Sequence, residues 1–389
     1  APIRLAPLHH TLNPPSSARA APLKSPPNPS PSISEISAEE PAPMALVSLC
    51  LLLLAAAAAV DGGKVPALIV FGDSSVDAGN NNQISTVLKS NFQPYGRDFP
   101  GGKSTGRFSN GRIPTDFISQ FFGIKPTVPA YLDPAYSISD FATGVCFASA
   151  GTGYDNATSD VLSVIPLYKQ LEYFKEYQAR LRAHAGMAEA ERILGEALYL
   201  MSMGTNDFLE NYYVMPGRRS EFGVAQYQDF LAGIAGGFIR AIYALGARKV
   251  SLGGLPPMGC LPLERSTNLL GQRACVSDYN AVAQQFNGKL VGLVGEVNRQ
   301  LPGARVVFSD TYAIFMRIIR SPGAYGFEVV ARACCSTGTF EMGYMCDNLN
   351  PLTCTDASKY VFWDSFHPTQ KTSLIMAAHL VKHALKEFM

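Results

Sequence analysis

The sequence ALIVFGDSSVDAGNNN occupies residues 67–82 and joins a short apolar run to a sharp turn. The run Ala67–Val70 has the length of a buried strand, and Phe71–Ser74 (FGDS) turns the chain at its carboxyl end. Open α/β sheets bind their ligands beyond the carboxyl ends of their strands. We therefore predict that Ser74 is a nucleophile in an active site. The alternative is that Gly-Asp-Ser is an ordinary turn tripeptide.

The composition is that of a globular protein with no polyanionic partner. The chain has 389 residues, 47% of them apolar, which is enough to bury a sizeable core. Lys plus Arg number 32 against 31 Asp plus Glu, and no long run carries one sign of charge. A nucleic-acid-binding surface needs a basic stripe, so we expect no nucleic-acid partner. Neither a repeat nor a linker follows residue 63, so residues 65–387 are predicted to form a single domain, which we expect to be a monomer.

The amino-terminal region has the composition of a leader and a targeting signal. Residues 1–43 are rich in Pro, Ser and Ala, lack an apolar period and begin without Met, so we expect a disordered or non-native leader. Residues 44–60 hold an apolar run of about 16 residues that ends in alanines, which is typical of a secretory signal peptide, although its positive n-region is missing. A membrane span needs about 20 residues, so we predict a secreted protein without a transmembrane anchor. Secretion would make the sequon Asn156-Ala157-Thr158 a glycosylation site at Asn156.

Eight cysteines agree with an oxidising compartment. Cys50 lies in the predicted signal peptide. Cys260 is expected to pair with Cys275, and Cys146 to remain a free thiol. The other four are clustered in sequence and allow three connectivities, between which spacing cannot choose; they are Cys334, Cys335, Cys346 and Cys354. Zinc is the competing interpretation, but two of the four are adjacent and no His accompanies them, so we expect no metal.

Strands and helices alternate along the rest of the chain. Short apolar runs predict strands at 67–70, 141–149, 197–203, 249–252 and 305–308. Apolar residues three or four apart predict helices at 115–122, 167–185, 225–245 and 276–301. Residues 94–112 form a long loop rich in Gly, Pro and Ser, of a kind that is usually functional or wall-forming. The alternation predicts an α/β fold with a mainly parallel sheet covered on both faces.

A serine nucleophile needs a general base, and the chain has few histidines that could serve as one. In DSFHP, Asp364 precedes His367 by three residues, and on a turn this spacing can bring the carboxylate to the ring nitrogen that faces away from substrate. Such a carboxylate fixes the tautomer and stabilises the imidazolium. The alternative is that Asp364 or Ser365 caps the final helix. The other histidines beyond the leader are expected to have surface or packing roles; they are His184, His379 and His383.

Two further strand-end turns can supply donors to an oxyanion. Gly151 has no side chain to keep a substrate carbonyl from its amide, and Asn206 carries a side-chain NH2 group. With the backbone N–H of Ser74, they predict an oxyanion hole of three donors. The alternatives are a simple turn glycine and a turn-capping amide. Asp77 and Asn80 are expected to hold the turn rather than to contact substrate.

The order of these motifs resembles one enzyme family. FGDSSVDAGNNN, GVCFASAGTG, GTNDF and DSFHPT are similar, in that order, to the four blocks of the GDSL (SGNH) esterases and lipases, and PYGRDFPGGKSTGRFSNGR and LPPMGCLP are similar to its plant branch. The resemblance covers about residues 65–387. It implies a three-layer α/β/α sandwich with a flavodoxin-like sheet, a triad of Ser74, His367 and Asp364, and an oxyanion hole of Ser74, Gly151 and Asn206.

Two positions depart from the family pattern. Cys146 stands where many relatives have Asn, which changes the support of the second block, and Ser75 replaces Leu, a change expected to affect packing more than chemistry.

These features together predict a secreted serine carboxylic ester hydrolase without a cofactor, acting on lipid or acylated cell-wall esters. An acyltransferase with the same triad and a catalytically silent binding protein are the alternatives. Several aromatic residues form either an apolar pocket wall or ordinary core; they are Phe99, Phe108, Tyr168, Tyr173 and Tyr212.

Overall fold

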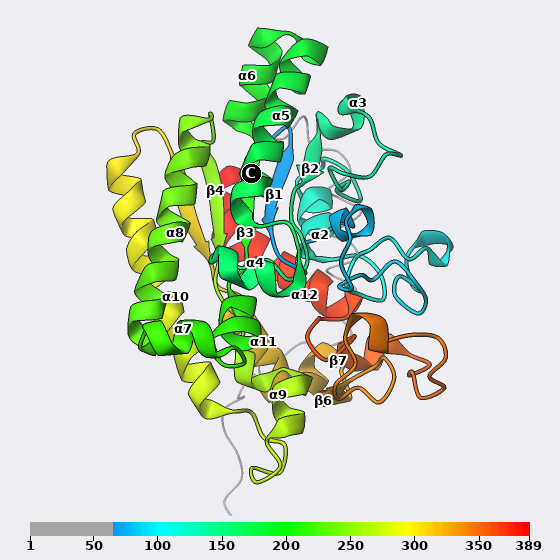
Figure 1. Ribbon diagram of the computed structural model, residues 1–389. Helices are drawn as coiled ribbons and strands as arrows, with labels where there is room; N and C mark the ends of the chain where they lie inside the picture. The colour runs from blue at the N-terminus through cyan, green and yellow to red at the C-terminus, as the bar shows by residue number, and fades with distance from the viewer. Residues whose placement is uncertain (1–64) are drawn as a thin grey trace, which may run out of the picture. The chain divides into compact units, whose positions relative to one another are not determined.

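The computed structural model describes residues 65–389, where five parallel strands form the central sheet (Figure 1). These strands are β1 (Leu68–Gly72), β2 (Gly144–Cys146), β3 (Leu198–Ser202), β4 (Lys249–Gly253) and β5 (Arg305–Ser309). Their order across the sheet is β2-β1-β3-β4-β5, the order of flavodoxin-like folds. The strand order reverses beside β1, and ligands bind at such a switch point. The fold thus makes the carboxyl end of β1 the place to look for chemistry.

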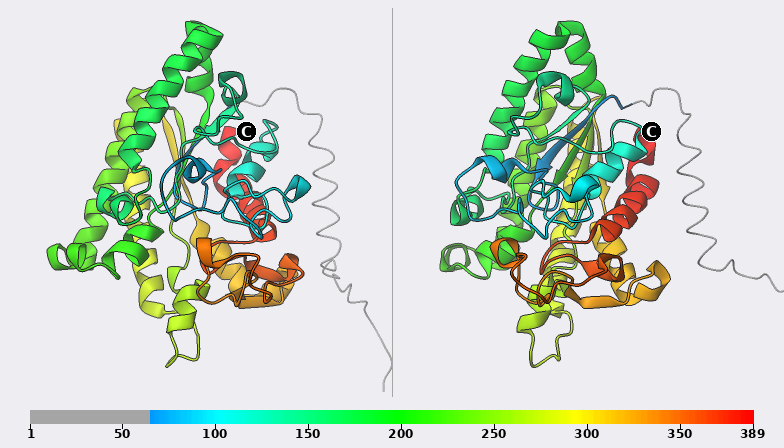
Figure 2. Two further views of the ribbon diagram at one scale, coloured as in Figure 1. Left: turned by 45° about the vertical axis from the view of Figure 1, so that its right-hand side comes forward. Right: turned by 90° about the vertical axis from the view of Figure 1, so that its right-hand side faces the viewer.

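Helices cover the sheet on both faces. Ile69 and Phe71 of β1 lie in one apolar cluster with residues of the helices α5 (Leu167–Ala185), α8 (Val224–Ala244) and α10 (Ser277–Gln300). Leu68 and Val70 lie in another cluster with residues of the helices α2 (Pro114–Phe121) and α12 (Gln370–Leu380). Figure 2 shows these two groups of helices on opposite sides of the strands. Alternate residues of a strand point to opposite faces, so the uninterrupted apolar run of β1 is explained by burial on both. The predicted three-layer α/β/α sandwich is confirmed.

Four of the helices, α2, α5, α8 and α10, lie where the periodic pattern predicts them, and α5 matches the predicted helix 167–185 at both ends. The helices are α2 (Pro114–Phe121), α3 (Ile138–Phe141), α4 (Asn156–Leu162), α5 (Leu167–Ala185), α6 (Met187–Glu196), α7 (Pro216–Glu221), α8 (Val224–Ala244), α9 (Pro262–Thr267), α10 (Ser277–Gln300), α11 (Thr311–Arg320) and α12 (Gln370–Leu380).

The second strand is shorter than the predicted strand 141–149. Phe141 ends α3, and β2 begins only at Gly144, whose φ of +144° breaks the run between helix and strand. Beyond β2 the backbone stays extended along β1, because the N–H groups of Phe147 and Ser149 donate to the carbonyls of Val70 and Gly72. The prediction of one strand over 141–149 is therefore wrong at its start, because the first residue of the apolar run belongs to a helix.

The register at the end of β1 places two turns side by side. Gly72 pairs with Ser202 of β3, and the N–H of Asp73 donates to the Ser202 carbonyl over 3.1 Å. Gly72 has a φ of +154°, and a Cβ there would lie 2.2 Å from the Ser202 carbonyl oxygen. Only glycine fits so close to the neighbouring strand, so the Gly of GDS serves backbone packing.

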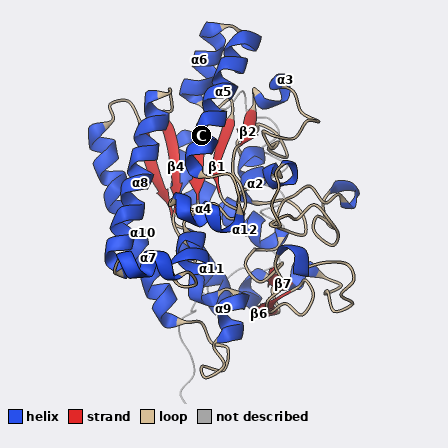
Figure 3. Ribbon diagram, viewed as in Figure 1, coloured by secondary structure: helices blue, strands red, loops and turns tan. Residues whose placement is uncertain are grey.

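A second, parallel pair of strands flanks the cysteine-rich segment, residues 334–354. β6 (Val329–Ala333) pairs with β7 (Tyr360–Phe362), and Figure 3 shows this pair among long loops, apart from the central sheet. Disulfides join Cys334 to Cys354 and Cys335 to Cys346. With all four sulfur atoms in disulfides, none is a thiolate ligand for zinc. The expected pair Cys260–Cys275 is present, and Cys146 is a buried free thiol.

The predicted leader (residues 1–43) and signal peptide (residues 44–60) lie outside the described residues. Between residues 65 and 389, no helix is long and apolar enough to cross a membrane.

Candidate active site

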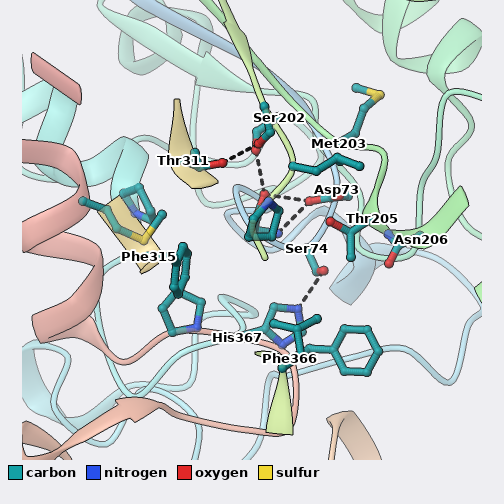
Figure 4. A pocket seen from close by; sticks show the side chains of 18 residues that line it. Asp73, Ser74, Ser202, Met203, Thr205, Asn206, Thr311, Phe315, Phe366 and His367 are labelled. Carbon is teal, nitrogen blue, oxygen red and sulfur yellow. Dashed lines mark hydrogen bonds between the residues drawn. The ribbon is translucent and has the colours of Figure 1, made fainter. Parts of the chain in front are cut away.

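The turn after β1 presents the hydroxyl of Ser74 to an imidazole. The Nε2 atom of His367 lies 2.7 Å from Ser74 Oγ, across 293 residues of sequence. Figure 4 shows the His367 ring pointing toward this hydroxyl. Ser74 is partly exposed, whereas His367 is 5% exposed. The geometry is that of a hydroxyl hydrogen-bonded to a general base.

The opposite side of the imidazole contacts Asp364. Both carboxylate oxygens lie 2.8 Å from His367 Nδ1, and Oδ1 also accepts the backbone N–H groups of Phe366 (2.9 Å) and His367 (2.7 Å). The side chain of Thr369 caps α12 by accepting the N–H of Thr372. The helix-cap interpretation of Asp364 is therefore wrong, since its carboxylate closes a turn back onto the imidazole of the same segment.

The three predicted oxyanion donors differ in their hydrogen bonds and in their place relative to the cavity at Ser74. Asn206 Nδ2 donates to the carbonyl of Thr152 over 3.0 Å, which leaves its second hydrogen free and ties it to the residue after Gly151. Within residues 65–389, no hydrogen bond engages the backbone N–H of Ser74 or of Gly151. Asn206 lines the cavity at Ser74, whereas Gly151 does not. At Gly151, φ is +87° and a Cβ would lie 2.8 Å from the Leu88 side chain, so this turn requires glycine.

Asp77 and Asn80 bind the first block of the sequence to the second, as expected. Asp77 Oδ1 accepts the N–H groups of Gly79 (2.7 Å) and Asn80 (2.8 Å), and its Oδ2 accepts that of Ala150 (3.0 Å). Asn80 Nδ2 donates to the carbonyls of Cys146 (2.9 Å) and Ala148 (2.7 Å). Both side chains are buried and neither lines the cavity. They fix the distance between the turns that carry Ser74 and Gly151.

Ser75 forms hydrogen bonds at the turn, a role that was not predicted from the sequence. Its Oγ donates to Asp73 Oδ1 over 2.7 Å, its N–H donates to the same oxygen over 2.9 Å, and Oγ lies 3.0 Å from the hydroxyl of Ser202. Burial raises the pKa of Asp73 to about 6, against the lowering effect of these bonds. An Asp followed by Ser two residues later is the pattern of an Asx turn, and this signal was present in the sequence.

A cavity of about 80 Å³ adjoins Ser74 and His367. Much of its lining is apolar and comes from the carboxyl ends of the strands and from α11 and α12 (Figure 4). These apolar residues include Met203, Leu255, Leu261, Phe315, Phe366 and Met376. Such a wall suits the hydrocarbon part of an ester. In the part of the chain that the structure describes, no three His, Cys, Asp or Glu side chains are grouped as metal ligands would be.

The aromatic residues suggested as a pocket wall do not line this cavity. Tyr168 is an exposed residue of α5, and Phe108 is buried with its ring 5.0 Å from that of His367. The remaining histidines also lie outside the cavity lining. His184 is exposed, and the rings of His379 and His383 lie 4.3 Å apart near the carboxyl end of the chain.

Comparison with known proteins agrees with the geometry. Residues 68–380 match the family model described as GDSL-like Lipase/Acylhydrolase. The chain belongs to this family. Three curated relatives from Arabidopsis thaliana, each named a GDSL esterase/lipase, are 61%, 59% and 63% identical to this GDSL protein. The alignments cover 88%, 86% and 84% of its chain and 98%, 96% and 93% of theirs. The GDSL protein is therefore an enzyme that hydrolyses ester bonds.

Buried carboxylates give the GDSL enzyme a testable pH dependence of stability. Burial raises the pKa of Asp77 to about 6 and that of Asp207 to about 7, against about 4 in an unfolded chain. The folded state binds a proton at each of these carboxyl groups more tightly than the unfolded chain does. Protonation therefore stabilises the folded state, fully below pH 4, and this contribution to the free energy of unfolding is lost as the pH rises through 6 to 7. We expect Tm from thermal unfolding to rise by about 5 °C between pH 8 and pH 5.

The Asp207→Asn variant separates this effect from other titrations. Asp207 accepts the N–H groups of Tyr154 and Asp155 and the hydroxyl of Thr158, so the variant should be less stable at every pH. Its Tm should also rise less on acidification, because one titrating group is gone. A wild-type Tm that falls steadily from pH 8 to pH 5 would contradict the prediction.

Proposed function

We propose that this GDSL enzyme is a serine carboxylic ester hydrolase whose triad is Ser74, His367 and Asp364. The observation that carries the proposal is the continuous set of contacts from Asp364 through His367 to Ser74, at 2.8 Å and 2.7 Å. A buried carboxylate, an imidazole and a partly exposed hydroxyl in this order activate a serine for attack on an acyl group. The family membership supports the same reaction class.

In the first step, Ser74 Oγ attacks the acyl carbonyl while His367 Nε2 takes the hydroxyl proton. Asp364 faces Nδ1 and stabilises the imidazolium that forms. The oxyanion accepts hydrogen bonds from the N–H groups of Ser74 and Gly151 and from Asn206 Nδ2. His367 then protonates the leaving alcohol, and the acyl group remains on Ser74.

In the second step, His367 activates a water molecule that attacks the acyl-enzyme. The carboxylic acid leaves and Ser74 regains its proton. The reaction requires no group beyond these side chains and amides, and EDTA should leave the rate unchanged.

The proposed substrates are acyl esters of lipids or of acylated cell-wall polymers. The apolar side of the cavity supports an acyl chain there, with the alcohol portion toward the partly exposed Ser74. A panel of p-nitrophenyl esters of increasing chain length tests this placement. We expect kcat/KM to pass through a maximum and then fall as the chain exceeds the cavity. A kcat/KM that does not change with the length of the acyl chain would contradict this placement.

The two alternative functions, an acyltransferase and a catalytically silent binding protein, are distinguished by their products. A fluorophosphonate should label the enzyme and abolish p-nitrophenyl ester hydrolysis in the same proportion. No labelling and no turnover would favour a catalytically silent binding protein. Product analysis in water with a competing alcohol separates the two reactions that share an acyl-enzyme, since an acyltransferase yields mainly the new ester.

We further propose that the enzyme is a secreted, glycosylated monomer with one hydrolase domain over residues 65–387, preceded by a leader and a signal peptide. The disulfides support an oxidising compartment, and Asn156 is exposed at the first residue of α4. The protein purified from a plant secretion medium should lose mass on treatment with an N-glycosidase, and an Asn156→Gln variant should not. Sedimentation should give the mass of a single chain.

A further inference from the structure

Tyr95 lies in the glycine-rich loop 94–112, a motif to which the reaction above assigns no role. Its ring is completely buried and meets three aromatic rings edge-on. The centroid distances are 5.7 Å to Phe92, 5.8 Å to Phe108 and 6.1 Å to Trp363. Packing of this kind leaves the ring one orientation and aims its hydroxyl at a fixed point.

The Tyr95 hydroxyl points at the carboxylate of Asp364. It donates to Asp364 Oδ2 over 2.6 Å and accepts the backbone N–H of Gly343 over 2.9 Å. The direction of both bonds is fixed, because an amide N–H can only donate and an ionised carboxylate can only accept. Burial and the adjacent Asp364 raise the pKa of Tyr95 well above its usual value, so the hydroxyl keeps its proton.

The two oxygens of Asp364 have different partners. Oδ1 accepts two backbone N–H groups of its own turn, whereas Oδ2 is held, apart from the imidazole, by the Tyr95 hydroxyl. Without the hydroxyl, Oδ2 would be fully buried with the imidazole as its one remaining partner. The side chain of Asp364 could then rotate, because only the backbone N–H groups at Oδ1 would hold the carboxylate in its orientation toward His367.

We propose that Tyr95 is a positioning residue that holds the carboxylate of Asp364 in line with His367. The inference rests on the proposed function, because it assigns Tyr95 a role through the triad. The support extends to the cysteine-rich segment, since Gly343 lies between the disulfide-bonded Cys335 and Cys346. Glu341 of the same segment accepts the N–H of Ser365 through its carbonyl, at 3.0 Å. The loop 94–112 and this segment together hold the Asp364 turn from two sides.

The Tyr95→Phe variant removes the hydroxyl and keeps the ring. We expect kcat for a p-nitrophenyl ester to fall about 10-fold while KM changes less than about 2-fold, because the loss affects proton transfer rather than substrate contacts. The rate is expressed per active site titrated with a fluorophosphonate, so kcat refers only to folded molecules even where part of the variant protein is unfolded. An unchanged kcat would overturn the inference.

Tyr199→Phe is the matched control. The Tyr199 side chain is also fully buried and its hydroxyl donates one hydrogen bond, to the carbonyl of Leu194 over 2.9 Å. Both variants should lower Tm to a similar degree, but the control should keep its kcat. Equal losses of kcat in the two variants would show a general effect of stability and overturn the inference.

A double-mutant cycle with Asp364→Ala tests whether Tyr95 acts through Asp364. With the carboxylate absent, Tyr95→Phe should change the residual kcat by less than about 2-fold. A further 10-fold loss in that background would overturn the inference. If Asp364→Ala alone retains the wild-type kcat, the proposed triad itself fails. If Asp364→Ala is slow and Tyr95→Phe is not, the triad stands and the role of Tyr95 is wrong.

Discussion

Replacing Ser74 with alanine should lower p-nitrophenyl ester hydrolysis by about 10⁴-fold or more, because no acyl-enzyme can form without the Oγ atom. The substitution removes one partly exposed oxygen whose hydrogen-bond partner is His367 Nε2. The fold should therefore survive, with Tm close to that of the wild type. Steady-state kinetics on a short ester measures the loss, and circular dichroism measures the fold.

Ser373→Ala is the control for this substitution. Ser373 is fully buried on α12, and its hydroxyl has no hydrogen-bond partner among the described residues. Its loss should change neither kcat nor KM. Wild-type turnover in a folded Ser74→Ala protein would remove Ser74 from the mechanism.

Replacing Asn206 with alanine should lower kcat by about 10² to 10³-fold, the usual cost of one oxyanion-hole donor. The free hydrogen of Asn206 Nδ2 is best used when the carbonyl oxygen becomes an anion, so KM should change little. The loss of the bond to the Thr152 carbonyl should also loosen the turn that carries Gly151. Steady-state kinetics with one ester gives kcat and KM separately. A fall in kcat with an unchanged KM indicates loss of transition-state stabilisation, whereas a rise in KM indicates loss of substrate binding.

Asn298→Ala provides the comparison. The Asn298 amide also bonds the backbone, at the N–H and carbonyl of Val306 over 2.8 Å each, and does not line the cavity. That variant should lose stability and keep kcat. A loss of less than about 3-fold in Asn206→Ala would exclude Asn206 as an oxyanion donor.

The sequence predicted the fold and the site where local signals agree with global packing. The apolar run of β1 belongs to a strand buried on both faces, as its short length and the turn that follows it predict. The end of each parallel strand then located Ser74, Gly151 and Asn206 at one edge of the sheet. His367 could be selected because few histidines remain after the leader.

The rest depends on contacts that spacing does not encode. Tyr95 and Asp364 are 269 residues apart, and their hydrogen bond follows from how two loops pack. The disulfide connectivity of the cysteine-rich segment depends on how its loops fold, because three pairings are compatible with the spacing. The start of β2 was missed because an apolar run does not tell a short helix from a strand. The hydrogen bonds of Ser75 were not predicted, although the spacing of Asp73 and Ser75 is that of an Asx turn.

Mass spectrometry of the fluorophosphonate-labelled protein tests the central claim most directly. The protein is labelled, digested and sequenced, beside the Ser74→Ala variant treated in the same way. We expect a single adduct on Ser74 of the wild type and no adduct in the variant. An adduct on another residue, or one that persists in Ser74→Ala, would contradict it.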